Sequence, residues 1–235
     1  MVVRLHPEPS RGAASLADRA YESLKQDIIA CEIAPSSSIS EARLAARYKI
    51  GKAPVRHALH GLVQERLVSA VPRRGYIVAP ITLQSVRELF DLRLLLEPAA
   101  AALAAGNVDA AHLRALDAIC AAGYVPGDKS SERKFLSANK ALHLAVASAS
   151  GNQRLAQALA LILEEMNRFF HFGLALRDRS DEMEHEHSAL VEALIAGDRE
   201  LARATAVDQI EAARRMVVEA LLSSAALDQA EITLG

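Results

Sequence analysis

The sequence predicts a mainly α-helical protein with an N-terminal winged helix-turn-helix and a C-terminal antiparallel helical bundle. Alanine and leucine are abundant while aromatic residues make up only 4% of the chain, and this composition favours helix over sheet. Three helical patterns and one hairpin pattern precede residue 81, and every later pattern is helical. A hydrophobic content of 51% with 24% charged residues excludes a globally disordered chain.

These patterns divide the chain into a flexible arm (residues 1–13), a winged helix-turn-helix (14–80), a helical effector and dimerisation domain (81–225) and a tail (226–235). Charge differs between the two ends. Residues 1–82 hold 12 lysine and arginine residues against 7 acidic ones, whereas the remainder holds 15 against 22. This asymmetry indicates that the N-terminal part binds a polyanion.

Local signals predict the first two helices. Apolar residues recur at every fourth position and predict a first helix that ends near Cys31. These positions are Leu16, Ala20, Leu24 and Ile28. The stretch "APSSSIS" predicts a turn, and Ser40 is placed to cap a second helix over residues 41–48.

A third helix is predicted from Lys52 to about Leu67, with Pro54 in its first turn, where a missing N–H costs little. One stripe along this helix is basic and the opposite stripe is apolar, as expected of a core-facing side. The basic stripe holds Lys52, Arg56 and His60, and the apolar stripe holds Val55, Leu59, Leu62 and Val63. Such a basic stripe is either a solvated helix face or a surface for a phosphate backbone.

The surroundings of this stripe favour nucleic acid. Basic residues precede the helix at Arg43, Arg47 and Lys49. The stretch "VSAVPRRGYIVAP" then predicts a hairpin with Arg73 and Arg74 at its tip. Three helices followed by a hairpin form the winged helix-turn-helix plan, in which the third helix enters the major groove.

Six helices are predicted beyond the hairpin, and the short connections between them imply antiparallel neighbours in a bundle. Their ranges are 83–105, 110–121, 130–150, 152–172, 180–196 and 198–222. Polar residues fall on otherwise apolar faces of four of these helices, and a buried polar group needs a partner. They are Arg93, Asn139, His143, His187 and Gln209. The set indicates either a ligand site or core histidines satisfied by neighbours, with Arg93 paired to Glu97.

Several classes of protein are disfavoured. Cys31 and Cys120 match no metal-binding spacing and indicate reduced thiols in a cytoplasmic protein. The most apolar run, "LRLLLEPAAAALAAG", is broken by Glu97 and Pro98 and is too short to span a bilayer. The first residues lack the apolar segment of a secretory signal. We therefore expect no membrane partner.

Residues 20–78 resemble the winged-helix domain of GntR-family transcription regulators, chiefly through "PVRHALHGL" and "RRG". The resemblance implies a homodimer that binds a double-stranded DNA operator, and it places DNA contacts at Lys52, Ala53, Arg56, Arg74 and Gly75. The neighbouring Arg43 and His57 complete the predicted DNA-binding set. Gly51 and Lys52 replace the usual Ser-Arg, and His57 replaces a glutamate, so the operator sequence cannot be transferred from a relative.

Three later stretches resemble the FCD effector domain of the FadR-like branch of that family. They are "SVRELFDLRLLLEPAAAALAA", "ANKALHLAVASASGNQRL" and "EHEHSALVEALIAGDRELARATAVDQI". The resemblance implies a site for a divalent metal ion, with zinc as the first candidate. Its ligands would be Asn139, His143, His187 and Gln209. Relatives have an aspartate and a third histidine where this chain has Asn139 and Gln209, and amides bind zinc less well. The alternative is that these side chains bind an organic anion directly, with Arg93 supplying positive charge.

We therefore expect a cytoplasmic, metabolite-responsive transcription regulator, a repressor whose operator affinity changes when a small carboxylate binds the C-terminal domain. It is not expected to be an enzyme. One alternative is a metal-dependent enzyme acting on small organic acids through His143 and His187, which is disfavoured because no carboxylate or nucleophile shares their inner faces. A second is an effector-independent DNA-binding protein, which a pocket too small for a metabolite would favour.

Overall fold

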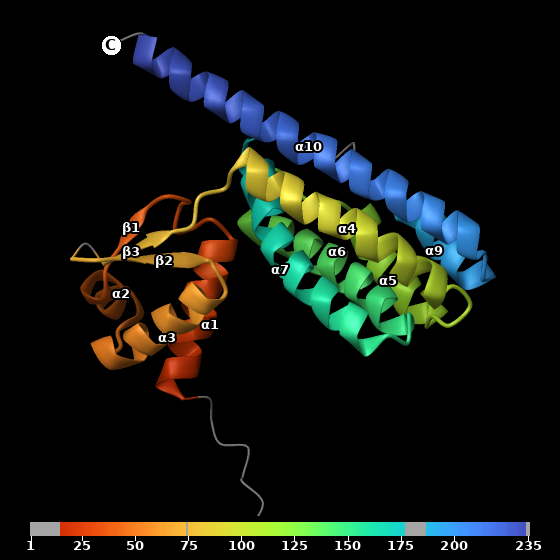
Figure 1. The fold of residues 1–235 in the computed structure, drawn as a ribbon, viewed down its shortest axis with the longest axis horizontal. Coiled ribbons are helices and arrows are strands. Elements are labelled where there is room, and N and C mark those ends of the chain that lie inside the picture. Colours follow the sequence, from red (N-terminus) through yellow and green to blue (C-terminus); the bar gives the residue numbers. More distant parts are fainter. Residues whose placement is uncertain (1–14, 74, 177–186, 234–235) are drawn as a thin grey trace, which may run out of the picture. The chain divides into compact units, whose positions relative to one another are not determined.

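The computed structural model describes residues 15–73, 75–176 and 187–233 (Figure 1). The arm expected over residues 1–13, Arg74 and the beginning of the helix expected over 180–196 lie outside the described residues. The chain forms two compact units, each with its own core: one ends at Pro80, and the other begins at Ile81 and also includes Ile29–Cys31. No helix among the described residues is long and apolar enough to cross a bilayer.

The N-terminal unit consists of three helices and a three-stranded antiparallel sheet in the order β1-β3-β2 (Figure 1). Its elements are α1 (Leu16–Ile29), β1 (Ser38–Ile39), α2 (Glu41–Tyr48), α3 (Lys52–Gln64), β2 (Val68–Val71) and β3 (Gly75–Val78). The predicted hairpin is present, with Val68 opposite Val78. The expected turn at "APSSSIS" also contains β1, in which Ser38 pairs with Ile77.

The ends of α2 and α3 follow from backbone chemistry. The Ser40 side chain accepts a hydrogen bond from the Arg43 N–H at 3.3 Å, which confirms the predicted cap of α2. The prediction that α3 reaches Leu67 was wrong. Arg66 adopts a left-handed φ of 60° and ends the helix early, and the Leu67 N–H donates to the Leu62 carbonyl.

The C-terminal unit is helical throughout the residues that the structure describes (Figure 1). Its elements are α4 (Leu83–Ala104), α5 (Ala110–Ala121), α6 (Lys129–Ala149), α7 (Gln153–Leu176), α9 (Ser188–Ala196) and α10 (Arg199–Thr233). α4 packs along α10, and α6 packs against α5 and α7. The expected end of the last helix at residue 222 was wrong, because α10 continues to Thr233.

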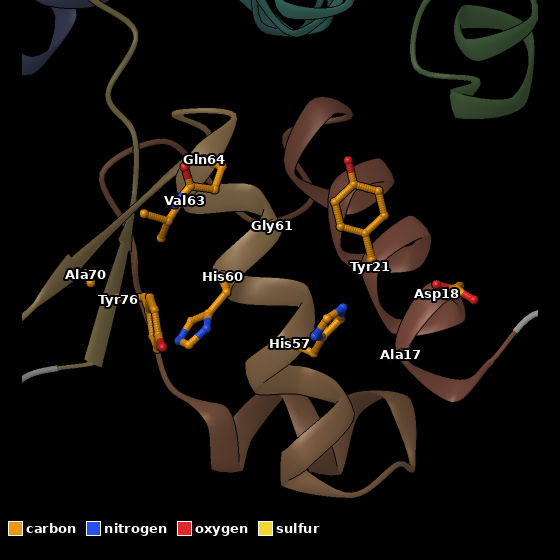
Figure 2. A pocket seen from close by; sticks show the side chains of 10 residues that line it. All are labelled: Ala17, Asp18, Tyr21, His57, His60, Gly61, Val63, Gln64, Ala70 and Tyr76. Carbon is orange, nitrogen blue, oxygen red and sulfur yellow. The ribbon is translucent and has the colours of Figure 1, made fainter.

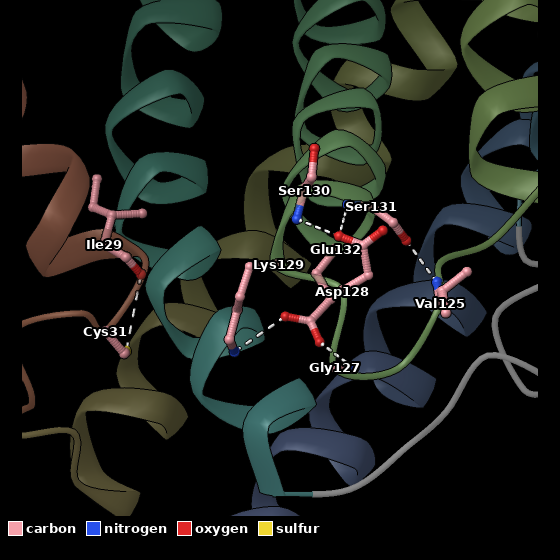
Figure 3. Close-up of polar contacts among 9 residues, drawn as sticks. All are labelled: Ile29, Cys31, Val125, Gly127, Asp128, Lys129, Ser130, Ser131 and Glu132. Atoms are coloured by element: carbon pink, nitrogen blue, oxygen red, sulfur yellow. Dashed lines mark hydrogen bonds and ion pairs between the residues drawn. The ribbon is translucent and has the colours of Figure 1, made fainter.

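Side-chain caps fix where these helices start. Thr82 and Ser85 form a capping box at α4, and Asp109 accepts from the His112 N–H at α5. At α6, the Asp128 carboxylate accepts from the Ser130 N–H at 2.9 Å (Figure 3). One turn later the buried Glu132 accepts from the Gly127 N–H at 3.1 Å. These contacts hold the loop before α6 against the helix that carries two of the candidate site residues.

Candidate functional site

The exposed face of α3 carries the predicted basic stripe. Lys52, Arg56 and His60 are exposed, as are Ala53 and His57 beside them. The apolar stripe faces the core as predicted, and its members Val55, Leu59 and Leu62 are buried. The core position of that stripe determines which side of α3 is presented to a partner.

The other predicted DNA-binding residues lie around this helix. Arg43 is exposed on α2, whereas Arg47 forms an ion pair with Asp27, in which Nη2 lies 2.7 Å from Oδ2. Gly75 begins β3 with a φ of 92°, and a Cβ there would lie 2.9 Å from the Ile39 carbonyl oxygen. A glycine is therefore required where the hairpin passes β1. Arg74, predicted at the hairpin tip, lies outside the described residues.

A groove of about 720 Å³ runs beside α3. Figure 2 shows His57 directed toward α1, where Asp18 and Tyr21 lie, and His60 directed toward Tyr76 of β3. The groove thus combines imidazole, phenol and carboxylate groups, which both donate and accept hydrogen bonds. Together with the basic stripe, this surface suits the mixed polar edges of base pairs and the phosphates beside them.

Arg56 is paired with a residue that sequence reasoning missed. Its Nε and Nη2 atoms donate to the two carboxylate oxygens of Glu41, each at 2.8 Å. Glu41 is the first residue of α2 and lies fifteen positions earlier in the chain. Helical spacing within α3 contains no signal for this contact, because it depends on how α2 packs against α3.

A polar cluster lies in the interior of the bundle. Arg93 is 2% exposed and Glu97, one turn later on α4, is 7% exposed. The Glu97 carboxylate accepts from the Arg93 guanidinium through Nε and through Nη2, the latter at 3.2 Å. The guanidinium also lies over the Phe90 ring at 5.4 Å. The expected pairing of Arg93 with Glu97 is confirmed.

Glu97 also joins α4 to α6. Its Oε2 atom lies 3.1 Å from His143 Nδ1. Burial alone raises the pKa of Glu97, but the charges of Arg93 and His143 and their hydrogen bonds outweigh it and lower the pKa to about 2. The statement that no carboxylate shares the inner face of His143 was therefore wrong. Glu97 lies on a different helix, and its helical pattern does not reveal that its side chain reaches α6.

The second histidine completes the cluster. The rings of His143 and His187 have centroids 5.4 Å apart and meet edge to face. His187 immediately precedes α9, and burial lowers its pKa to about 3, so the imidazole is neutral at physiological pH. Asn139 lies one turn before His143 on α6 and is buried, and Gln209 is half-buried on α10. The contacts therefore run from Arg93 through Glu97 and His143 to His187.

The interior around this cluster is nearly filled. A cavity of about 10 Å³ lies against Glu97 and His143, between apolar residues such as Ala101 and Leu190. That volume holds about one water molecule and no organic acid. One nitrogen of the guanidinium, Arg93 Nη1, is buried and has no hydrogen-bond partner among the described residues. A buried donor of this kind carries a free-energy cost that a ligand acceptor would relieve.

The structure does not confirm the predicted zinc site. Among the described residues, no group of three or more histidine, cysteine, aspartate or glutamate side chains is placed to hold a metal ion. His143 Nδ1 lies 3.1 Å from the Glu97 carboxylate, which leaves Nε2 of that ring as its metal-binding atom. Of the four predicted ligands, His143 and His187 supply imidazoles, whereas Asn139 and Gln209 supply neutral amides, and zinc sites in proteins use imidazole, thiolate and carboxylate ligands.

Comparisons with known proteins agree with both units. The family model described as bacterial regulatory proteins, gntR family, matches residues 16–78, and that of the FCD domain matches residues 88–212. The HTH-type transcriptional repressor GlaR of Escherichia coli (strain K12) is 30% identical over 76% of this chain and 84% of its own length. BphR of Paraburkholderia xenovorans, an uncharacterized HTH-type transcriptional regulator, is 26% identical over 83% of this chain and 82% of its own. The solved structure of E. coli McbR/YncC has a TM-score of 0.75 at 22% identity, covering 88% of this chain and 99% of that one, which shows a shared fold.

Proposed function

The chain belongs to the gntR family of bacterial regulatory proteins and carries an FCD domain, and on this premise we propose that it is a cytoplasmic repressor that binds a double-stranded DNA operator. The observation that carries the proposal is the exposed face of α3. There Lys52, Ala53, Arg56 and His57 lie opposite a buried apolar stripe. Arg43 and the hairpin residues Arg74 and Gly75 complete the proposed surface. The repressor assignment draws on relatives such as GlaR.

We propose that the chain acts as a homodimer. An apolar stripe on α4 supports this, because Leu92, Leu95 and Leu103 share one side of the helix. Leu95 is 72% exposed and the other two are more than 40% exposed. Exposed leucines that share one side of a helix are typical of a surface that another molecule covers. A two-fold dimer would present two copies of α3 to a symmetric operator.

The effector in this proposal is a small carboxylate that binds the bundle interior. Arg93 supports it, because its buried Nη1 donor would gain an acceptor from a ligand carboxylate. In this proposal Asn139, His143, His187 and Gln209 supply further hydrogen-bonding groups to the ligand. Since the cavity holds about one water, the ligand would bind a more open state of the bundle and shift the population toward it. No metal ion is part of this proposal, because only two of the four predicted ligands are imidazoles and the other two are amides, which bind zinc weakly.

A second candidate is a DNA-binding regulator without an effector. The cavity of about 10 Å³ favours it, since a closed interior needs no ligand to be stable. A metal-dependent enzyme has less support. The relatives are transcriptional regulators, and the described residues place no three-ligand group for a metal.

Operator binding is tested with the full chain and a random-sequence duplex library. We expect repeated selection to enrich a two-fold symmetric duplex, and Arg56→Ala to weaken binding to it. Failure to enrich any duplex would refute operator binding.

The effector is tested by a thermal-shift screen of small organic acids, followed by titration of the selected duplex with and without each stabilising acid. An acid that stabilises wild type and changes its operator affinity, but has no effect on His187→Ala, supports the effector site. Operator binding by His187→Ala should remain intact, because His187 lies in the other unit. If no acid alters operator binding, the effector-independent candidate is correct.

A further inference from the structure

We propose that Glu41 is a positioning residue for DNA recognition, which holds the Arg56 guanidinium so that one edge of it faces the operator. The inference rests on the proposed operator binding. It concerns a residue outside the predicted DNA-binding set and a property, sequence selectivity, that the surface of α3 alone does not explain.

The geometry of the pair is well defined. Arg56 Nε donates to Glu41 Oε1 and Nη2 donates to Oε2, both at 2.8 Å, so both carboxylate oxygens bind one side of the guanidinium. The Glu41 side chain is 22% exposed, whereas that of Arg56 is 59% exposed. The carboxylate is therefore partly enclosed at the start of α2, where Ser40 caps the helix, and the guanidinium extends from it into solvent.

The contact with Glu41 leaves a useful part of Arg56 free. A guanidinium carries five N–H groups, and Glu41 occupies the one on Nε and one of the two on Nη2. The remaining Nη2 hydrogen and an Nη1 hydrogen lie parallel along the adjacent, terminal edge of the guanidinium. That edge is the fork that matches the O6 and N7 acceptors of guanine. Glu41 thus orients Arg56 for a bidentate contact and removes its other orientations.

The charge of Glu41 acts on the whole basic stripe. The hydrogen bond from Arg56 lowers the pKa of Glu41, and the charges of Arg56, Lys52 and His60 lower it further. The carboxylate is therefore ionised at physiological pH and offsets the attraction of the stripe for phosphates. Attraction to phosphates is independent of DNA sequence, so the Glu41 charge weakens binding to all DNA equally. The guanine-matched edge of Arg56 then discriminates the operator from other sequences.

The experiment compares Glu41→Gln with wild type on two probes: the duplex that wild type selects from the random library, and a scrambled duplex of equal length. Glutamine keeps the shape of the side chain and removes its charge. We expect the ratio of the two affinities to fall roughly tenfold, because Arg56 loses its fixed orientation. The affinity of Glu41→Gln for the scrambled duplex should equal or exceed that of wild type. The slope of log affinity against log salt concentration should steepen by about one. Glu22→Gln, at an exposed position of α1, removes the same charge and should leave the ratio unchanged.

Arg56→Ala provides the internal check. Adding Glu41→Gln to Arg56→Ala should have no further effect on the ratio, because the positioned side chain is already absent. Two results would overturn the positioning role. One is an affinity ratio in Glu41→Gln equal to that of wild type, and the other is a fall in that ratio as large in the Arg56→Ala background as in wild type. Equal weakening on both duplexes would also overturn it and would indicate a folding defect, which the thermal midpoint would reveal. If wild type selects no duplex, operator binding itself is refuted; a selected duplex with an unchanged ratio refutes the role of Glu41 alone.

Discussion

His143 Nδ1 on α6 lies 3.1 Å from Oε2 of Glu97 on α4, and the same carboxylate binds Arg93 one turn earlier. One buried anion therefore serves both a guanidinium and an imidazole. The arrangement pairs the buried Arg93, Glu97 and His143 side chains with one another without a ligand. It also explains why the cavity beside His143 is small, since the side chains contact one another rather than surround a space.

Replacing Glu97 by alanine should destabilise the protein by about 3–5 kcal/mol, because it leaves the buried Arg93 charge without its partner. Urea unfolding at pH 7.5 measures the change. Replacing Arg93 and Glu97 together by methionine should cost less than Glu97→Ala alone, since no uncompensated charge remains. The control is Glu192→Ala, which removes the exposed pair with Arg114 and should barely move the midpoint. A double variant less stable than Glu97→Ala would contradict this account.

Acid should destabilise the bundle through His187. Its pKa in the folded protein is about 3, below the ordinary value of 6.5, because burial opposes the charged form. Between these values the unfolded chain binds a proton that the folded chain excludes, so the free energy of unfolding falls as pH falls. One such group contributes up to about 1.4 kcal/mol per pH unit. Half-buried His171, with a pKa lowered to about 4 chiefly by burial, acts in the same direction.

His187→Gln should therefore flatten the dependence of unfolding free energy on pH between about 6.5 and 4. Urea unfolding at several pH values measures the slope for both proteins. A substitution that only weakened packing would lower stability equally at every pH, and parallel curves would count against titration of His187.

Zinc should bind this chain weakly, and Gln209→His should raise its affinity. The substitution adds an imidazole, a better zinc ligand than an amide, at the fourth predicted ligand position. Metal analysis after dialysis against zinc gives the bound fraction. Gln84→His, on the exposed first turn of α4, adds a histidine away from the cluster and is the control. Equal retention by Gln209→His and wild type would show that Gln209 does not face a potential metal position.

Gly75→Ala should destabilise the N-terminal unit by about 1–3 kcal/mol, because a side chain would occupy a left-handed position and approach the Ile39 carbonyl. Scanning calorimetry measures the transition of that unit. Gly123→Ala, in the C-terminal unit, is the control and is measured on the transition of its own unit, since its φ is 64° but nothing lies within 4 Å of the added Cβ. This variant should be destabilised only by the cost of placing alanine in a left-handed backbone conformation. A smaller effect at Gly75 than at Gly123 would contradict the importance of the close approach to β1.

The sequence alone determined most of the helices and which face of each is buried. Helix α5 has the predicted bounds 110–121, and Val55, Leu59 and Leu62 face the core as their spacing predicted. Capping by Ser40 was likewise predictable. These features depend on hydrogen bonds and side-chain periodicity within a few residues, and that information is contained in any short stretch of the chain.

Only the tertiary structure decided which polar side chains from different elements meet. Strand β1 exists because Ser38 pairs with Ile77, and Arg56 meets Glu41 because α2 and α3 pack at a particular rotation. Glu97 reaches His143 for the same kind of reason, and their contact fills the space that a ligand would need. Periodicity assigns a residue to a face but not to a neighbour. The neighbour depends on the rotation and separation of two packed elements, which the whole core sets together.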